Sequence, residues 1–188
     1  MKTKYLLLFR HGEGDVSLSK DGKKMIASYE YILQQIFASL TIGIYYSPHC
    51  LAKETAEMLS KFLSPNECIV QEKLLVDKDH YTDFGWLSNF VQEKKDPREE
   101  KQETGFFAKL FKKQSLQKNV QVPIDVLVLV THMDYVEFFP SIYAKKMGVD
   151  KKFSFMTSLG KSVLLDLNSW EAILLPCKDP ELQKFLGK

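Results

Sequence analysis

Six short apolar runs along the chain, each bounded by polar or turn residues, are typical of buried β-strands. They lie at residues 5–9, 41–46, 68–70, 125–130, 161–167 and 172–175. The runs at 5–9 and 125–130 are almost wholly apolar and do not alternate with polar residues, as expected for strands that are covered on both faces. The pattern therefore predicts a sheet with further layers on both sides.

Apolar residues at helical spacing separate several of these runs. The spacing predicts one helix from about residue 21 to 40, a second from Ser47-Pro48 to residue 63, and a third from about 135 to 147. Ser47 is expected as the N-cap of the second helix, and Pro140 could disturb the third. Strands alternating with helices predict an α/β fold, a three-layer sandwich with a mostly parallel central sheet flanked by helices.

Three of the predicted strands end in groups that could bind a ligand. Arg10 and His11 follow the first strand, Ser47 follows the second, and Thr131-His132 end the run at 125–130. In open α/β sheets ligands bind beyond the carboxyl ends of the strands. The sequence therefore predicts a binding crevice where these groups meet.

Composition narrows the classes of function. The chain has 188 residues and a formal net charge of +2, which gives no argument for binding nucleic acid. No apolar stretch approaches the roughly 20 residues that cross a bilayer, and no signal-peptide cleavage site follows the first apolar run. Three cysteines without paired spacing argue against disulfides and zinc and favour a reducing, cytoplasmic setting. No feature specifies an oligomeric state.

The sequence at residues 10–12 has the chemistry of phosphoryl transfer. Arg10 is one of only two arginines, against 24 lysines, so a planar bidentate donor is expected to matter there. His11 can attack phosphorus and hold the phosphoryl group covalently. Gly12 lets the backbone come close to the phosphoryl oxygens, whose charge needs cations and N–H donors.

Four phrases in order resemble the histidine phosphatase superfamily, which has the phosphoglycerate-mutase-like fold. They are LLFRHGE at 7–13, LSKDGKKMI at 18–26, SPHCLAKETAE at 47–57 and VLVLVTH at 126–132. The gap between His11 and Leu18 leaves no room for the polar segment of the mutase branches. The spacing is similar to that of the small bacterial phosphohistidine phosphatase branch, and it makes a mutase the weaker alternative.

The resemblance implies a mechanism and a set of site residues. His11 is expected to be the nucleophile, and His132 to donate a hydrogen bond to the phosphoryl group. The expected phosphate-binding residues are Arg10, Gly12 and Glu13. The substrate is expected to be a phosphorylated small molecule or a phosphoprotein, hydrolysed without a metal or organic cofactor.

The acid that protonates the leaving group is less sharply indicated. Asp77 is the nearest match to the acidic residue of the family, within LLVDKDHYTDFGW at 74–86. Asp79 and Asp83 compete with it, and Glu13 is a further alternative because it lies beside the nucleophile. His80 is expected to have a surface or packing role.

Leu51 departs from the family pattern, because it stands where the resemblance implies a second phosphate-binding arginine. Losing such a donor costs roughly 2.7–4 kcal/mol of transition-state stabilisation, by analogy with an oxyanion hole. His49 or Lys53 could lend a replacement charge, although neither shares the direction of position 51 on a helix. The alternative function is therefore a catalytically attenuated relative that binds phosphate or a phosphoprotein.

Two expectations concern the chain as a whole. Residues 1–188 are expected to form a single histidine phosphatase-like domain with a charged surface insertion at about 92–119, either a solvated excursion or a lid or docking arm. A metal site formed by His11 and His132 is a further alternative, but no local ligand spacing supports it.

Overall fold

One mixed sheet forms the centre of the computed structural model, which describes residues 3–71, 74 and 124–187. Its strands in the described part are β1 (Tyr5–Arg10), β2 (Ile42–Tyr46), β3 (Glu67–Val70), β4 (Val126–Thr131), β5 (Ser162–Asp166) and β6 (Ala172–Leu175). They lie side by side in the order β3-β2-β4-β1-β5-β6. Among these strands β5 alone runs in the direction opposite to the others, so the predicted mostly parallel sheet is confirmed.

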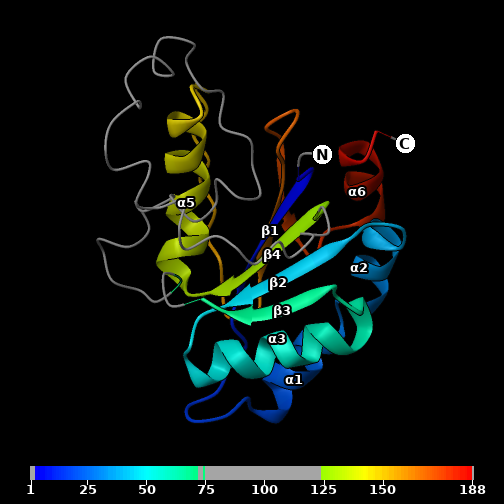
Figure 1. Cartoon of the computed structure of the whole chain (residues 1–188), viewed down its shortest axis with the longest axis vertical. Coiled ribbons are helices and arrows are strands. Elements are labelled where there is room, and N and C mark those ends of the chain that lie inside the picture. Colours follow the sequence, from blue (N-terminus) through cyan, green and yellow to red (C-terminus); the bar gives the residue numbers. More distant parts are fainter. Residues whose placement is uncertain (1–2, 72–73, 75–123, 188) are drawn as a thin grey trace, which may run out of the picture.

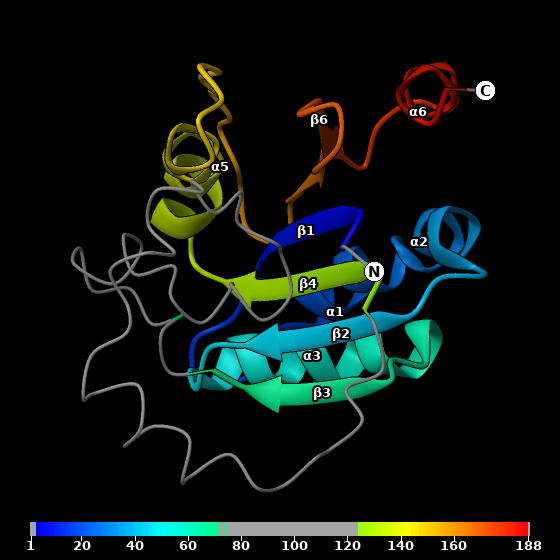
Figure 2. The ribbon, with the colours of Figure 1, turned by 45° about the horizontal axis from the view of Figure 1, so that its top comes forward.

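Helices cover both faces of the sheet. The described helices are α1 (Lys20–Ala27), α2 (Glu30–Phe37), α3 (Cys50–Leu63), α5 (Met133–Lys146) and α6 (Asp179–Phe185). Helices α1, α2, α3 and α6 contribute to one apolar cluster and α5 to the other, and α5 lies across the sheet from α1 and α3 (Figure 1 and Figure 2). The predicted three-layer α/β fold is confirmed.

Alternation within the buried strands divides the core into these two clusters. In β1, Leu7 and Phe9 enter the cluster with α1, α2 and α3, whereas Leu6 and Leu8 enter the cluster with α5. All four side chains are at most 1% exposed. Successive residues of a strand point to opposite faces, so an uninterrupted apolar run is what a strand between two helical layers requires.

The single helix predicted at 21–40 is wrong, because two helices occupy that range. The break follows α1, where the Ser28 hydroxyl donates to the Met25 carbonyl at 2.6 Å. The next residue, Tyr29, is fully buried and its hydroxyl donates to the Leu175 carbonyl at 2.6 Å. A serine that bonds to the local backbone competes with helical continuation, and the buried tyrosine fixes the corner.

The predicted N-cap of α3 is also wrong. Helix α3 begins at Cys50 and its N-cap is His49, in extended conformation with φ −61° and ψ 137°. Ser47 instead prolongs the sheet, since its N–H donates to the Val130 carbonyl at 2.9 Å. Ser47 therefore belongs to the end of the sheet and lies outside helix α3.

Smaller differences affect the second half of the chain. Helix α5 continues through Pro140 without interruption, and helix α6 was not predicted. No helix in the described part of the chain is long and apolar enough to span a bilayer. The segment expected at 92–119 lies outside the described residues, so the single domain and its insertion stay predictions.

Candidate active site

The pairing of β1 with β4 brings two predicted site histidines together. Arg10 pairs with Thr131 in the parallel ladder, and the His11 N–H extends the ladder by donating to the Thr131 carbonyl at 2.9 Å. The residue that follows each strand end is a histidine, and the His11 and His132 rings lie edge to face with centroids 5.1 Å apart. Figure 2 shows β2, β3 and β4 pointing to this same edge of the sheet.

The His11 ring is held with one nitrogen occupied. Its Nδ1 lies 2.9 Å from the Gly12 carbonyl oxygen. Because a carbonyl oxygen only accepts, Nδ1 is the protonated nitrogen and Nε2 carries the lone pair. The ring is half-buried, so this Nε2 is the atom that is available to attack an electrophile.

The loop after His11 is tied to the first turns of α3. The Gly12 N–H donates to the Thr55 hydroxyl at 3.1 Å, and that hydroxyl donates to the Leu51 carbonyl at 2.7 Å. A Cβ on Gly12 would lie only 2.8 Å from side-chain atoms of Leu18 and Ile26. Glycine at position 12 therefore fits tight packing on the core side, while its expected contact with phosphate stays a prediction.

Arg10 is anchored by the loop before β5. One of its Nη groups donates to the Thr157 carbonyl, and its buried Nε–H has no partner among the described residues. Thr157 is itself held by Glu137 of α5, whose carboxylate accepts from the Thr157 N–H at 2.8 Å and from its hydroxyl at 3.1 Å. Glu137 thus holds Thr157 in place, and the Thr157 carbonyl in turn positions the Arg10 side chain.

Sequence reasoning did not identify Glu137 as part of the site. Glu137 acts through a residue 20 positions later in the chain, so no local pattern could have indicated it. The nearby Gly160, with φ +68°, donates its N–H to the His11 carbonyl at 2.9 Å. The loop at 157–160 therefore supports both Arg10 and His11.

A third histidine joins the pair. The His49 ring stacks beside His11 with centroids 5.7 Å apart, and lies edge to face with His132 at 5.3 Å. The argument that His49 does not share the direction of position 51 assumed a helical backbone, whereas His49 precedes the helix in extended conformation. Histidine is not a common N-cap residue, so the sequence gave little sign of this placement.

Ser47 links the other two histidines of the cluster. Its hydroxyl oxygen lies 3.1 Å from His132 Nε2 and accepts the His49 N–H at 3.2 Å. Ser47 is fully buried. With Nε2 engaged by Ser47, Nδ1 is the His132 nitrogen left for a ligand.

Crowding and burial keep these rings neutral. Burial, together with the smaller effects of the neighbouring His11, His49 and Arg10, lowers the pKa of His132 to about 4. Burial likewise lowers the pKa of His11; the hydrogen bond with the Gly12 carbonyl raises it in part, and His49 and Arg10 lower it. Both rings are therefore uncharged near pH 7, and the lone pair of His11 is free.

Position 51 is part of the hydrophobic core. Leu51 is 3% exposed and belongs to the apolar cluster that joins α1, α2 and α3 to the sheet. The side chain that the resemblance expects to bind phosphate is here a packing residue. The described residues thus show Arg10 as the one arginine beside the three histidines.

The acidic candidates divide into two groups. Glu13 is exposed and lines an open hollow with residues 14–17, Ser19 and Leu159. Asp77, Asp79 and Asp83 lie outside the described residues, as does His80. The roles expected of Glu13 and Asp77 stay predictions.

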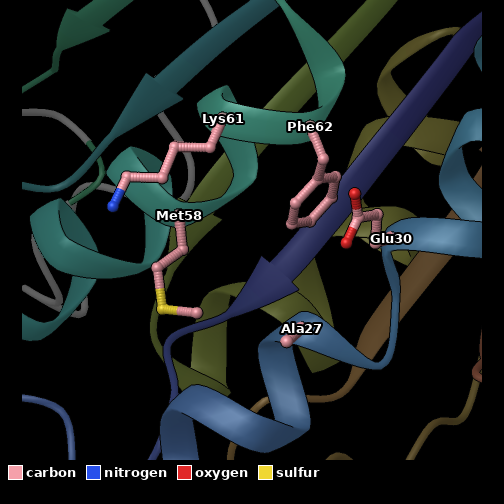
Figure 3. Close-up of a pocket in the computed structure, with 5 residues that line it drawn as sticks. All are labelled: Ala27, Glu30, Met58, Lys61 and Phe62. Carbon is pink, nitrogen blue, oxygen red and sulfur yellow. The ribbon is translucent and has the colours of Figure 1, made fainter.

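Other arrangements in the described part do not extend this site. No group of three or more His, Cys, Asp or Glu side chains there is arranged to hold a metal ion. A pocket of about 210 Å³ is lined by Ala27, Glu30, Met58, Lys61 and Phe62. Figure 3 shows the Phe62 ring facing Glu30, with the Lys61 amine pointing away. This pocket lies along the last turns of α3, whereas His49, with the other two histidines beside it, lies at the start of that helix.

The lowered pKa of His132 predicts a pH-dependent stability. Between pH 6.5 and about 4 the unfolded chain binds a proton at this residue that the folded chain excludes. His132 therefore causes no loss of folding stability above pH 6.5, and the folded state is progressively destabilised as the pH falls from 6.5 to about 4. We expect His132→Gln to reduce the loss of unfolding free energy between about pH 7 and about pH 4.5, measured by urea denaturation. Equal losses in both proteins would contradict the assignment.

The support of Arg10 by Glu137 predicts an effect on anion binding. Glu137→Ala removes the acceptor for Thr157 and should weaken tungstate binding severalfold, because the Thr157 carbonyl no longer holds the guanidinium in place. Glu137→Gln is the matched control, since its amide oxygen can still accept the Thr157 N–H. Calorimetry gives the dissociation constants of tungstate. Equal values for the alanine variant and the wild type would exclude a role of Glu137 in positioning Arg10.

The burial of Leu51 predicts that restoring arginine is costly. Leu51→Arg buries a charge without a partner and should lower the free energy of unfolding by more than about 2 kcal/mol. Leu51→Met keeps the volume and should cost less than about 1.5 kcal/mol. Urea denaturation of both variants checks this, and an arginine variant as stable as the methionine variant would show that position 51 tolerates a charge.

Comparison with solved structures identifies the fold. SixA of Agrobacterium tumefaciens, assigned as a phosphohistidine phosphatase, is similar with a TM-score of 0.54 and 11% identity, over 93% of this chain and 98% of that one. The protein histidine phosphatase SixA in complex with tungstate has a TM-score of 0.51 and 13% identity, over 90% and 93% of the two chains. Phosphoglycerate mutase of Plasmodium falciparum has a TM-score of 0.50 and 16% identity, over 94% and 91%.

Sequence comparison adds no further relative. No family model matches the chain, and no curated protein matches it. At 11–16% identity the structural likeness concerns the fold. The similarity predicted from four short phrases is thus confirmed at that level: the chain has the phosphoglycerate-mutase-like fold of the histidine phosphatases.

Proposed function

We propose that the protein is a phosphatase that hydrolyses a phosphomonoester or a phosphohistidine through a phosphohistidine intermediate on His11. The observation that carries this proposal is the His11 ring, whose Nδ1 is occupied by the Gly12 carbonyl while its neutral Nε2 remains available. It lies between an anchored arginine and two further histidines. This is the arrangement that an attack on phosphorus requires.

In the first step, His11 Nε2 forms a bond to phosphorus and the bond to the leaving oxygen or nitrogen breaks. Arg10 and His132 Nδ1 donate to the non-bridging oxygens and stabilise their charge. An acid protonates the leaving atom, and Asp77 is the residue proposed for this role, with Asp79, Asp83 and Glu13 as alternatives. Glu13 is otherwise proposed to line the phosphate site through its loop.

In the second step, water attacks the phosphorus of the phosphohistidine and gives up a proton to the carboxylate that protonated the leaving atom, which restores the acid. The P–N bond breaks, its electron pair returns to His11 Nε2, and inorganic phosphate leaves. The lowered pKa of His11 favours both steps, because the ring is unprotonated when it attacks and is restored unprotonated afterwards. The proposal needs no metal ion or organic cofactor.

The proposed substrate is a phosphorylated small molecule or a phosphoprotein, with phosphohistidine first among the possibilities. Two of the similar structures are SixA proteins, one named a protein histidine phosphatase and solved with tungstate, an analogue of phosphate. The short connection from His11 to Leu18 supports the same branch. The proposal places the protein in the cytoplasm, in keeping with its unpaired cysteines.

A second candidate function is binding of phosphate or a phosphoprotein with little or no turnover. The observation that favours it is Leu51, which fills a core position where an arginine would otherwise serve the site. The two functions differ in the rate of the chemical step and share the binding site. Turnover and anion binding must therefore be measured on the same preparations.

The nucleophile can be tested with a variant that keeps the local hydrogen bond. In His11→Asn the side-chain amide can still donate to the Gly12 carbonyl, but no ring nitrogen remains to attack. We expect wild type to hydrolyse an aryl phosphate or a phosphohistidine peptide in the presence of a chelator, and the variant to be at least about a thousandfold slower.

Trapping strengthens this test. Acid-labile phosphate bound to wild type during turnover, and absent from His11→Asn, would support the intermediate. Undiminished hydrolysis by His11→Asn would overturn the proposed mechanism. Tungstate binding by a wild type that hydrolyses neither substrate would favour the binding function.

A further inference from the structure

We propose, resting on the proposed function, that His49 binds the phosphoryl group directly and takes over the contact that Leu51 cannot make. The first observation is position. His49 has an extended backbone and precedes the first turn of α3. The centroid of its ring lies 5.7 Å from that of His11 and 5.3 Å from that of His132. Any group held on His11 Nε2 between these rings lies within reach of His49.

The second observation is the proton. His49 Nδ1 lies 3.4 Å from the Leu51 N–H. A backbone N–H only donates, so Nδ1 is the acceptor and the ring proton lies on Nε2. The Cys50 thiol, 4.0 Å from the same Nδ1, is a second neighbour on that side. The outer edge of the ring therefore presents an N–H, the kind of group that an anionic oxygen binds.

The third observation is the cost of using histidine as a cap. Ser, Asp and Asn are much better N-cap residues, and the backbone here is already supported by the bond from the His49 N–H to Ser47. The N-cap role alone does not explain why the exposed His49 imidazole packs against the rings of His11 and His132. Helix α3 begins at the residue after His49, so the positive end of its dipole lies beside this ring and favours an anion there.

The rival for this contact is Lys53, the other residue considered near position 51. Its ammonium group lies 4.0 Å from Glu57 Oε1, and its side chain is 60% exposed on the helix surface. Lys53 therefore belongs to an (i, i+4) pair facing solvent. The geometry favours His49, a donor that keeps the charge of the free site low.

The decisive experiment is calorimetric binding of tungstate to four full-length proteins. His49→Asn retains a good N-cap but is too short to place a donor at the position of Nε2. We expect it to bind about tenfold to a hundredfold more weakly than wild type, the range for losing one hydrogen bond to a charged group. His49→Gln carries an amide N–H near the Nε2 position and should regain part of the affinity. Lys53→Gln should bind like wild type.

The outcomes separate this inference from the proposed function. Equal affinity of His49→Asn and wild type, a loss confined to Lys53→Gln, or a wild type that binds no tungstate would each overturn the role of His49. Thermal melting of each variant distinguishes lost binding from lost folding. Turnover by His11→Asn at the wild-type rate would instead remove the proposed mechanism, while the tungstate comparison would still decide whether His49 holds the anion.

Discussion

The parallel register between β1 and β4 is the constraint on which the rest of the site depends. Arg10 lies opposite Thr131 because Leu6, Leu7, Leu8 and Phe9 are opposite residues 127–130. Each of these side chains is buried on one face or the other, so a slip of one residue would turn apolar side chains out of their clusters. The packing of the core thus fixes which residues follow the strand ends, and His11 and His132 meet as a consequence.

The proximity of His11 and His132 disfavours the charged form of each ring. Two half-buried rings near an arginine and a third ring are disfavoured in their charged forms, which is why the pKa of His132 falls to about 4 and that of His11 falls as well. In the proposed mechanism, a bound phosphoryl group carries negative charge into the same place and reverses the balance. The low charge of the free site would then keep the proposed nucleophile unprotonated, while the N–H groups around it donate to the anion.

The sequence predicts the fold and the central pair of residues because both depend on local patterns. Apolar runs indicate the strands, and the rule for parallel sheets then places His11 and His132 at one edge. His49 escaped this reasoning because a shift of the N-cap from Ser47 to His49 changes the direction of one side chain without changing the hydrophobic pattern. Glu137 escaped it because its effect reaches Arg10 only through the Thr157 backbone. Asp77 lies outside the described residues, so its proposed role still depends on the sequence.

Leu51 and His49 lie two residues apart at the start of α3 but in different surroundings, since Leu51 is buried in the core and His49 is exposed. Position 51 lies on the core side of α3, where an apolar side chain contributes to packing and an arginine would have to remain desolvated. Position 49 precedes the helix, so in the proposed site its side chain reaches the anion without entering the core. A donor at 49 and not at 51 separates binding from packing, so position 51 can be apolar while the proposed site keeps a third donor. The proposed contact replaces a bidentate charged contact with a single N–H donor. In the proposed phosphatase, such a site would suit a substrate whose phosphoryl bond is already labile, because less of the transition-state charge then has to be stabilised by the protein.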